Sequence, residues 1–159
     1  PRGPQGIQGL AGPAGPRGPA GSVNAGGYNL DVVFAALHSD WDNKNFNGSN
    51  LNGVDIYAPD GIYSIRNVSF RNCKMKYVSL EEELINCDFQ GADLSFEADD
   101  EVEFVNCNFK GAKLNILVDD FENDGYKIVN WKEYINSQND DWVYFENCIM
   151  PDGSRYTSD

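Results

Sequence analysis

The chain has few of the side chains on which enzymes and metal sites depend. Its 159 residues include a single histidine, His38, and its four cysteines are never paired at the CxxC spacing. A zinc site needs paired cysteine or histidine ligands, and no set of nucleophile, base and orienting acid can be assembled from the rest. We therefore expect no catalytic residues, no metal site and no cofactor, and predict that the protein is not an enzyme.

Positive charge and long apolar runs are also scarce. Twelve lysines and arginines stand against 25 aspartates and glutamates, which gives a formal net charge of −13. Such a charge repels nucleic acid and anionic membranes, and no apolar run approaches the roughly 18 residues of a membrane span. We expect neither nucleic-acid binding nor membrane insertion. Because the sequence begins inside a repeat and shows no signal peptide, we expect it to be part of a longer protein whose N-terminal part carries an anchor.

Glycine occupies every third position at the start of the chain. The seven positions are Gly3, Gly6, Gly9, Gly12, Gly15, Gly18 and Gly21. Only glycine fits at the axis of a collagen triple helix, so the period predicts a collagen-like rod over residues 1–23. The alternative, a disordered Pro/Gly linker, needs no period. No proline precedes a glycine, so the rod does not depend on hydroxyproline, which suits a microbial or viral protein.

A triple helix implies a homotrimer, and so short a rod needs a clamp downstream. We expect a linker and a possible neck helix over residues 24–42, with Asn29 or Asp31 as its N-cap. Four apolar residues share one face if residues 29–41 are helical: Leu30, Phe34, Leu37 and Trp41. This face either forms a trimeric neck or packs on its own domain.

An internal repeat begins after residue 43. Copies start at Phe46, Phe70, Leu84 and Phe104, and a partial copy starts at Phe145, so the offsets are 24, 14, 20 and 41 residues. Within a copy, a large apolar residue recurs every five positions, and a small or modest one stands two places before it. A period of five matches neither a strand nor an α-helix, and it indicates a solenoid of stacked coils.

Two segments carry a resemblance to a known family. Cys87-Asp-Phe-Gln-Gly-Ala-Asp-Leu94 and Cys107-Asn-Phe-Lys-Gly-Ala-Lys-Leu114 resemble the pentapeptide-repeat family, and the likeness extends over residues 44–116 and, weakly, 143–153. It implies a right-handed β-helix in which each pentapeptide forms one side of a coil. The expected fold is thus a collagen triple helix followed by a mainly β head over residues 43–159. The uneven offsets favour a short, irregular β-helix with a neck helix and one inserted helix, assembled as a homotrimer.

The repeat predicts which side chains point inward. The expected inward column contains Cys73, Cys87, Cys107, Cys148, Phe89, Leu94, Phe109 and Leu114. All four cysteines occupy the same slot of the repeat. We expect them to be buried free thiols, because side chains stacked in parallel have the wrong relative direction for a relaxed disulfide.

The 41-residue offset marks an insertion, residues 117–142. Ile128, Trp131 and Ile135 share a helical face there, and Asp124-Gly125 precedes them as a helix start, so we expect a helix that covers an open end of the solenoid. Three aromatic residues outside the well-formed copies are candidates for partner binding: Tyr134, Trp142 and Tyr144. The alternative is that they only cap the solenoid.

Acidic pairs such as Asp119-Asp120 have two interpretations. Some β-helical enzymes cleave polysaccharides with facing carboxylates, but acidic corners that keep a surface soluble are the favoured explanation. Residues 120–125 begin like a calcium loop, yet Trp131 stands where the bidentate glutamate belongs.

A collagen-like rod followed by a compact β head resembles the fibres and spikes of bacteriophages and other viruses. The resemblance implies a structural trimeric fibre or spike of a virion, anchored at its N-terminal side and presenting the head to a host-surface glycan or protein. A bacterial cell-surface collagen-like adhesin is the alternative, and reduced cysteines favour assembly inside a cell and hence the virion. A second alternative is an acidic, DNA-mimicking pentapeptide-repeat inhibitor.

Overall fold

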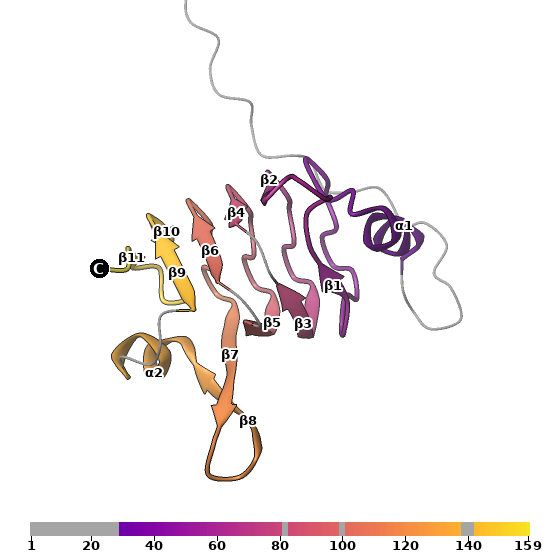
Figure 1. The fold of residues 1–159 in the computed structure, drawn as a ribbon. Helices are drawn as coiled ribbons and strands as arrows, with labels where there is room; N and C mark the ends of the chain where they lie inside the picture. The colour runs from indigo at the N-terminus through magenta and orange to yellow at the C-terminus, as the bar shows by residue number, and fades with distance from the viewer. Residues whose placement is uncertain (1–28, 81–82, 99–100, 138–141) are drawn as a thin grey trace, which may run out of the picture.

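The computed structural model describes residues 29–80, 83–98, 101–137 and 142–159. These residues form a mainly β head, as predicted, with two short helices at its margins (Figure 1). The predicted triple helix, residues 1–23, lies outside the described residues, as does the start of the predicted linker. Nothing in the described part is a helix long and apolar enough to span a membrane.

The strands form two sheets, and successive strands along the chain belong to the two sheets alternately (Figure 1). Neighbouring strands within each sheet run parallel, except for β8. The first sheet consists, in order, of β1 (Asp55–Ile56), β3 (Lys74–Leu80), β5 (Asp93–Ala98), β7 (Lys113–Asp120) and the antiparallel β8 (Gly125–Asn130). The second consists of β2 (Ser64–Arg66), β4 (Glu83–Ile85), β6 (Val102–Val105) and β9 (Val143–Glu146). Because the chain alternates between the sheets, each circuit forms one coil, and the coils stack as a solenoid.

The register of the coils corrects the sequence alignment. Parallel bridges join equivalent positions in the order Asn45, Ser69, Asp88, Asn108 and Ile149. The second offset is therefore 19 residues, from Ser69 to Asp88, where the alignment gave 14. Phe70 lies over Phe89, and Leu84 pairs instead with Phe104. The alignment slipped by one pentapeptide, because a large apolar residue at every fifth position looks the same after a shift of five.

Stacked phenylalanine rings run through the core. Ring centroids are 5.9 Å apart between Phe46 and Phe70, 5.2 Å between Phe70 and Phe89, and 5.0 Å between Phe89 and Phe109. The planes differ by at most 18°. Such aromatic pairs contribute roughly 0.5–1.5 kcal/mol each beyond the area that they bury. All eight residues of the predicted inward set are buried, including Leu94 and Leu114.

The four cysteines are buried and free, but they do not form one column. Three of them stack in register: Cys87, Cys107 and Cys148. Cys73 belongs to a neighbouring column, because Lys74 pairs with Asp93 and this places Cys73 over Ala92. The single column of four is therefore wrong, for the same reason that the alignment slipped.

Most of these thiols donate a hydrogen bond to the coil before their own. The Sγ atom of Cys73 lies 3.0 Å from the carbonyl oxygen of Phe46, and that of Cys107 lies 3.1 Å from the carbonyl oxygen of Leu84. The Sγ atom of Cys148 makes the equivalent contact with the carbonyl oxygen of Phe104, at 3.1 Å. Burial is the largest cause that raises the pKa of the Cys107 thiol well above its ordinary value. The cysteines thus act as small core residues that also satisfy buried carbonyl groups.

Asparagines form the corner that follows the second sheet. Asn43, Asn67, Asn86, Asn106 and Asn147 all adopt left-handed backbone conformations, with φ between 49° and 57°. The side-chain amide of Asn67 donates to Oδ1 of Asn43 at 2.9 Å, and that of Asn147 donates to Oδ1 of Asn106 at 2.7 Å. Asparagine tolerates the left-handed region better than most residues, so one residue type supplies both the turn and a link between coils.

Helix α1 (Leu30–His38) closes the N-terminal end of the solenoid (Figure 1). Asn29, one of the two predicted caps, accepts a hydrogen bond from the Asp31 N–H at 2.8 Å. Val32 and Ala35 are buried in the core. Trp41 lies beyond the helix and packs edge-on against Phe46, with ring centroids 5.4 Å apart. The prediction that Trp41 belongs to the neck face is therefore wrong.

The C-terminal end is closed by β10 (Cys148–Ile149), β11 (Arg155–Tyr156) and the last residues. The hydroxyl oxygen of Ser158 accepts a hydrogen bond from the Phe145 N–H at 3.0 Å, and the Ser158 N–H donates to the Phe145 carbonyl at 2.7 Å. Thr157 accepts a hydrogen bond from the Asn147 N–H at 2.9 Å. These contacts satisfy backbone groups that an open last coil would expose.

The insertion contains a hairpin before its helix. β8 pairs antiparallel with β7, and α2 (Trp131–Asn136) follows with a capping box between Asn130 and Glu133. Ile128 lies in β8 and is 53% exposed, so it does not share the predicted helical face. Trp131 and Ile135 do pack against the core. Ile128 fitted the helical spacing by coincidence, because it precedes Trp131 by three residues but belongs to the strand β8.

The asparagine corner predicts that two substitutions of Asn67, where φ is 56°, differ in their effect on stability. Asn67→Gly loses the side-chain hydrogen bonds but fits the backbone, whereas Asn67→Ala also places a Cβ in the left-handed region at a cost of about 1 kcal/mol or more. We expect the alanine variant to unfold at lower urea concentration than the glycine variant. Equal midpoints would show that backbone conformation does not matter at this corner.

Burial of the thiols predicts that they react slowly with thiol reagents. Because all four thiols are buried, and burial also raises the pKa of Cys107, native protein should react negligibly with a thiol reagent even near pH 8.5, about the ordinary cysteine pKa. After denaturation four thiols per chain should react. Rapid modification of any cysteine in the folded protein would contradict this burial.

Candidate binding face

Differences in length between the coils concentrate at one corner. The chain passes from the first sheet to the second through residues 57–63, 81–82, 99–101 and 121–142, and the last of these connections includes β8 and α2. We call the described part of these connections the variable corner. In solenoid proteins, insertions of this kind gather on one face, which is often the binding face.

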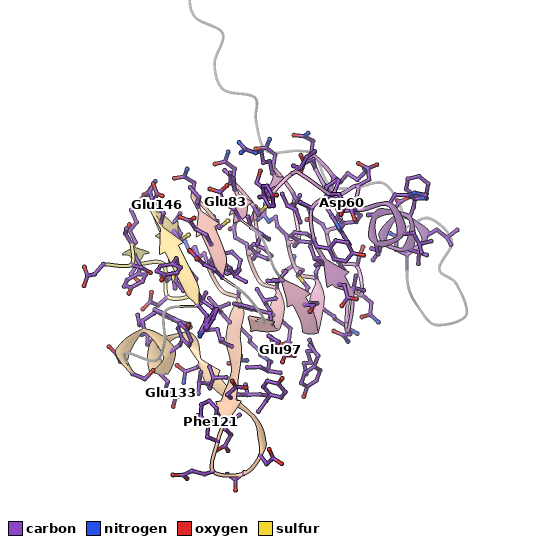
Figure 2. All side chains as sticks on the ribbon, in the orientation of Figure 1. Asp60, Glu83, Glu97, Phe121, Glu133 and Glu146 are labelled. Carbon is purple, nitrogen blue, oxygen red and sulfur yellow. The ribbon has the colours of Figure 1, made fainter. Side chains whose placement is uncertain are left out.

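Among the described residues, seven aromatic side chains have more than two-fifths of their surface exposed, and five of them belong to the variable corner: Tyr57 (42%), Tyr63 (77%), Phe121 (91%), Tyr126 (58%) and Trp142 (51%). The other two are Phe34 on α1 and Tyr77 on β3. Phe121 lies on the β7–β8 hairpin, which projects away from the stacked coils (Figure 2). Exposed aromatic residues in number mark interaction surfaces in soluble proteins, so the aromatic composition points to the same face as the loop lengths.

The three aromatic residues predicted to bind a partner have different positions. Tyr134 is 6% exposed, and its hydroxyl oxygen accepts a hydrogen bond from the Val143 N–H at 3.2 Å, so it belongs to the cap. Tyr144 is half-buried on β9, in register with Glu103. Only Trp142 is exposed at the variable corner. For Tyr134 the prediction of a binding role is wrong, because α2 turns its ring toward the core.

Sequence reasoning missed Tyr57 and Tyr63. Both lie in the connection between β1 and β2, around the turn Pro59-Asp60-Gly61. The signal was present in the first offset, because 24 residues exceed the 20 of the regular coil. The excess lies in this connection.

The same connection forms one wall of a hollow of about 540 Å³. Its polar and aromatic lining residues are Asp55, Tyr57, Asp60, Tyr63 and Ser79. Asp60 lies at the end of the solenoid that α1 covers (Figure 2). Asp55 and Ser79 come from the paired strands β1 and β3, so the floor of the hollow is regular sheet.

Several acidic residues outside the hollow are shaped by local contacts within the head. Asp120 accepts hydrogen bonds in the β7–β8 turn, first from the Asn123 side chain, which lowers its pKa. Hydrogen bonds from Ser154, and then the ion pair with Lys132, lower the pKa of Asp152 to about 2. The ion pair with Lys132 also ties α2 to the C-terminal turn. Burial, followed by repulsion from Glu83, raises the pKa of Glu103. Within the described ranges, no group of three or more histidines, cysteines or acids could hold a metal ion.

The outer face of α1 is a second exposed apolar surface. Leu30, Phe34 and Leu37 are 52%, 55% and 76% exposed, whereas Trp41, the fourth predicted neck residue, is 1% exposed. The inner face, Val32 and Ala35, already packs on the solenoid. The head therefore does not use the outer face for its own core.

The different environments of the aromatic residues predict different effects on stability. Tyr134→Ala should lower the free energy of unfolding by about 3 kcal/mol, because it empties a buried site. Tyr134→Phe should cost about 1 kcal/mol through the lost contact with Val143. Trp142→Ala should change stability by less than about 0.5 kcal/mol. Thermal melting followed by circular dichroism tests the order, and a large loss in Trp142→Ala would make that residue part of the cap.

No family model, curated protein or solved structure matches the chain.

Proposed function

We propose that the chain is a structural, trimeric fibre or spike protein of a virion, such as a phage head or tail fibre, that presents its head to a host surface. One observation carries the proposal. The strict glycine period ends at Gly21, and after eight intervening residues the chain enters α1, whose outer face exposes Leu30, Phe34 and Leu37. A segment that requires three chains is followed at once by an apolar surface that one chain leaves uncovered.

The short connection supports a neck. Eight residues extend over at most about 29 Å, at about 3.6 Å per residue. Three α1 helices that leave one triple helix are therefore held close to its axis, and their outer faces have each other as nearest apolar partners. Packing Phe34 and Leu37 against two other copies removes apolar surface from water, worth roughly 25 cal/mol per Å². The three heads then set the register from which the rod forms.

The form of the head supports a presenting role. We interpret it as a short, irregular, right-handed β-helix of the pentapeptide type, closed at one end by α1 and at the other by residues 154–158. A DNA-mimicking inhibitor of that type is a long regular dimer, and the closed ends and the variable corner do not suit one. The rod spans about 65 Å at about 3.1 Å per residue. It would hold three copies of one binding face away from the anchor, so that weak contacts add up.

Buried free thiols support assembly inside a reducing cell and hence a virion. A collagen-like adhesin on a bacterial surface is the second candidate, supported by the same rod and head. The two are separated by locating the protein with an antibody, because it is found either in purified virions or on intact cells.

The neck predicts the oligomeric state of the full chain. Light scattering should give a trimer, and Phe34→Glu combined with Leu37→Glu should shift the mass toward that of a monomer, because charges would face the same charges at the contact. Tyr126→Glu, an exposed aromatic position on β8, is the matched control and should remain trimeric. Gly12→Ala should lower the melting temperature of the rod and leave the heads associated. A dimer, or a trimer unaffected by the α1 changes, would refute the proposed neck.

A further inference from the structure

The hollow beside β1 depends on residues that the solenoid does not need. The regular crossing from the first sheet to the second, between β3 and β4, takes two residues, whereas the crossing from β1 to β2 takes residues 57–63. Gly61 has a φ of 79°, and the Ile62 N–H donates to the Pro59 carbonyl at 2.9 Å, so the extra residues form a defined turn. Ala58 is buried and fixes the turn to the core. The turn holds two tyrosines at the rim instead of adding to the core.

The side chains around the hollow have unused binding capacity. Tyr57 and Tyr63 are 42% and 77% exposed. Together with Asp55 and Asp60, they make no side-chain hydrogen bond or ion pair to the other residues that the structure describes. A volume of about 540 Å³ falls within the roughly 300–1,000 Å³ of small-molecule sites.

This combination of groups selects a ligand class. Tyrosine rings bind the apolar C–H face of a sugar ring. Free carboxylates accept hydrogen bonds from sugar hydroxyls, and charged acceptors form the stronger hydrogen bonds. The same carboxylates, in a chain with a net charge of −13, repel sialic and uronic acids. We propose that the hollow lined by Tyr57, Tyr63, Asp55 and Asp60 binds neutral sugar rings of a surface glycan.

The proposal rests on the attachment role proposed above and gives it a ligand. Three copies on one trimer make weak single sites useful, because the second and third contacts become intramolecular. A neighbouring head is a poorer occupant of the hollow. The projecting hairpin carries Asp119, Asp120, Glu122 and Asp124 beside Phe121, and these acids would face Asp55 and Asp60.

Saturation-transfer NMR on the full-length trimer tests the proposal with methyl glycosides of glucose, galactose, mannose and N-acetylglucosamine. At least one should bind in the millimolar range and lose at least tenfold in affinity in Tyr63→Ala and in Asp60→Asn. Tyr77→Ala, an exposed aromatic position on β3 outside the hollow and the variable corner, is the matched control and should bind as the unchanged protein does. Melting temperatures should be equal in all three variants, because each side chain is exposed.

Three results would overturn the site: no binding of any glycoside in the panel, binding that survives both Tyr57→Ala and Tyr63→Ala, or equal binding of methyl sialoside. Burial of the hollow between heads would also overturn it, and would appear as protection of Tyr57 and Tyr63 from iodination in the trimer. Light scattering on the same samples keeps the proposals separate. A trimer that binds no sugar refutes only this site, and a sugar-binding dimer refutes only the fibre.

Discussion

Parallel stacking of the coils is the constraint on which the rest of the head depends. Hydrogen-bonded strands lie about 4.8 Å apart, so each inward or corner side chain lies directly over its equivalent in the next coil. This spacing suits side chains that pack well against their own kind. Phenylalanine rings stack 5.0–5.9 Å apart, asparagine amides donate to asparagine carbonyls, and thiols reach the carbonyl groups of the coil before.

A stack of coils has two ends, and both are closed in this chain by segments that break the parallel pattern. Helix α1 packs Val32 and Ala35 against the first coil. At the other end, Ser158 supplies a donor and an acceptor to Phe145, and β8 runs antiparallel along the edge strand β7. Closing the ends prevents one head from adding to another through its open strands. In the proposed trimer, association between copies would then fall to the rod and the outer face of α1.

The repeat was readable in the sequence because an inward residue must recur at every fifth position. The same regularity hid the register, since a shift by five residues leaves the pattern intact, and this shift placed Cys73 in the wrong column. Near the ends the pattern was ambiguous. Trp41 continued a helical spacing but belongs to the core, and Ile128 continued another but lies in a strand. The sequence could not show which aromatic side chains are exposed at the variable corner. An aromatic residue outside the repeat can belong to a cap, as Tyr134 does, or to the surface, as Tyr63 does.

The variable corner also has a consequence for how such a head can evolve. One connection there has two residues and another has 22, residues 121–142, yet the strands on either side keep parallel register. Loops whose ends are fixed by a rigid scaffold tolerate replacement at little cost in stability. Under the proposed attachment role, binding specificity could therefore change by exchange of a single connection at this corner, while the stacked coils keep their fold. In the proposed trimer, foreign peptides inserted at this corner would be displayed in groups of three.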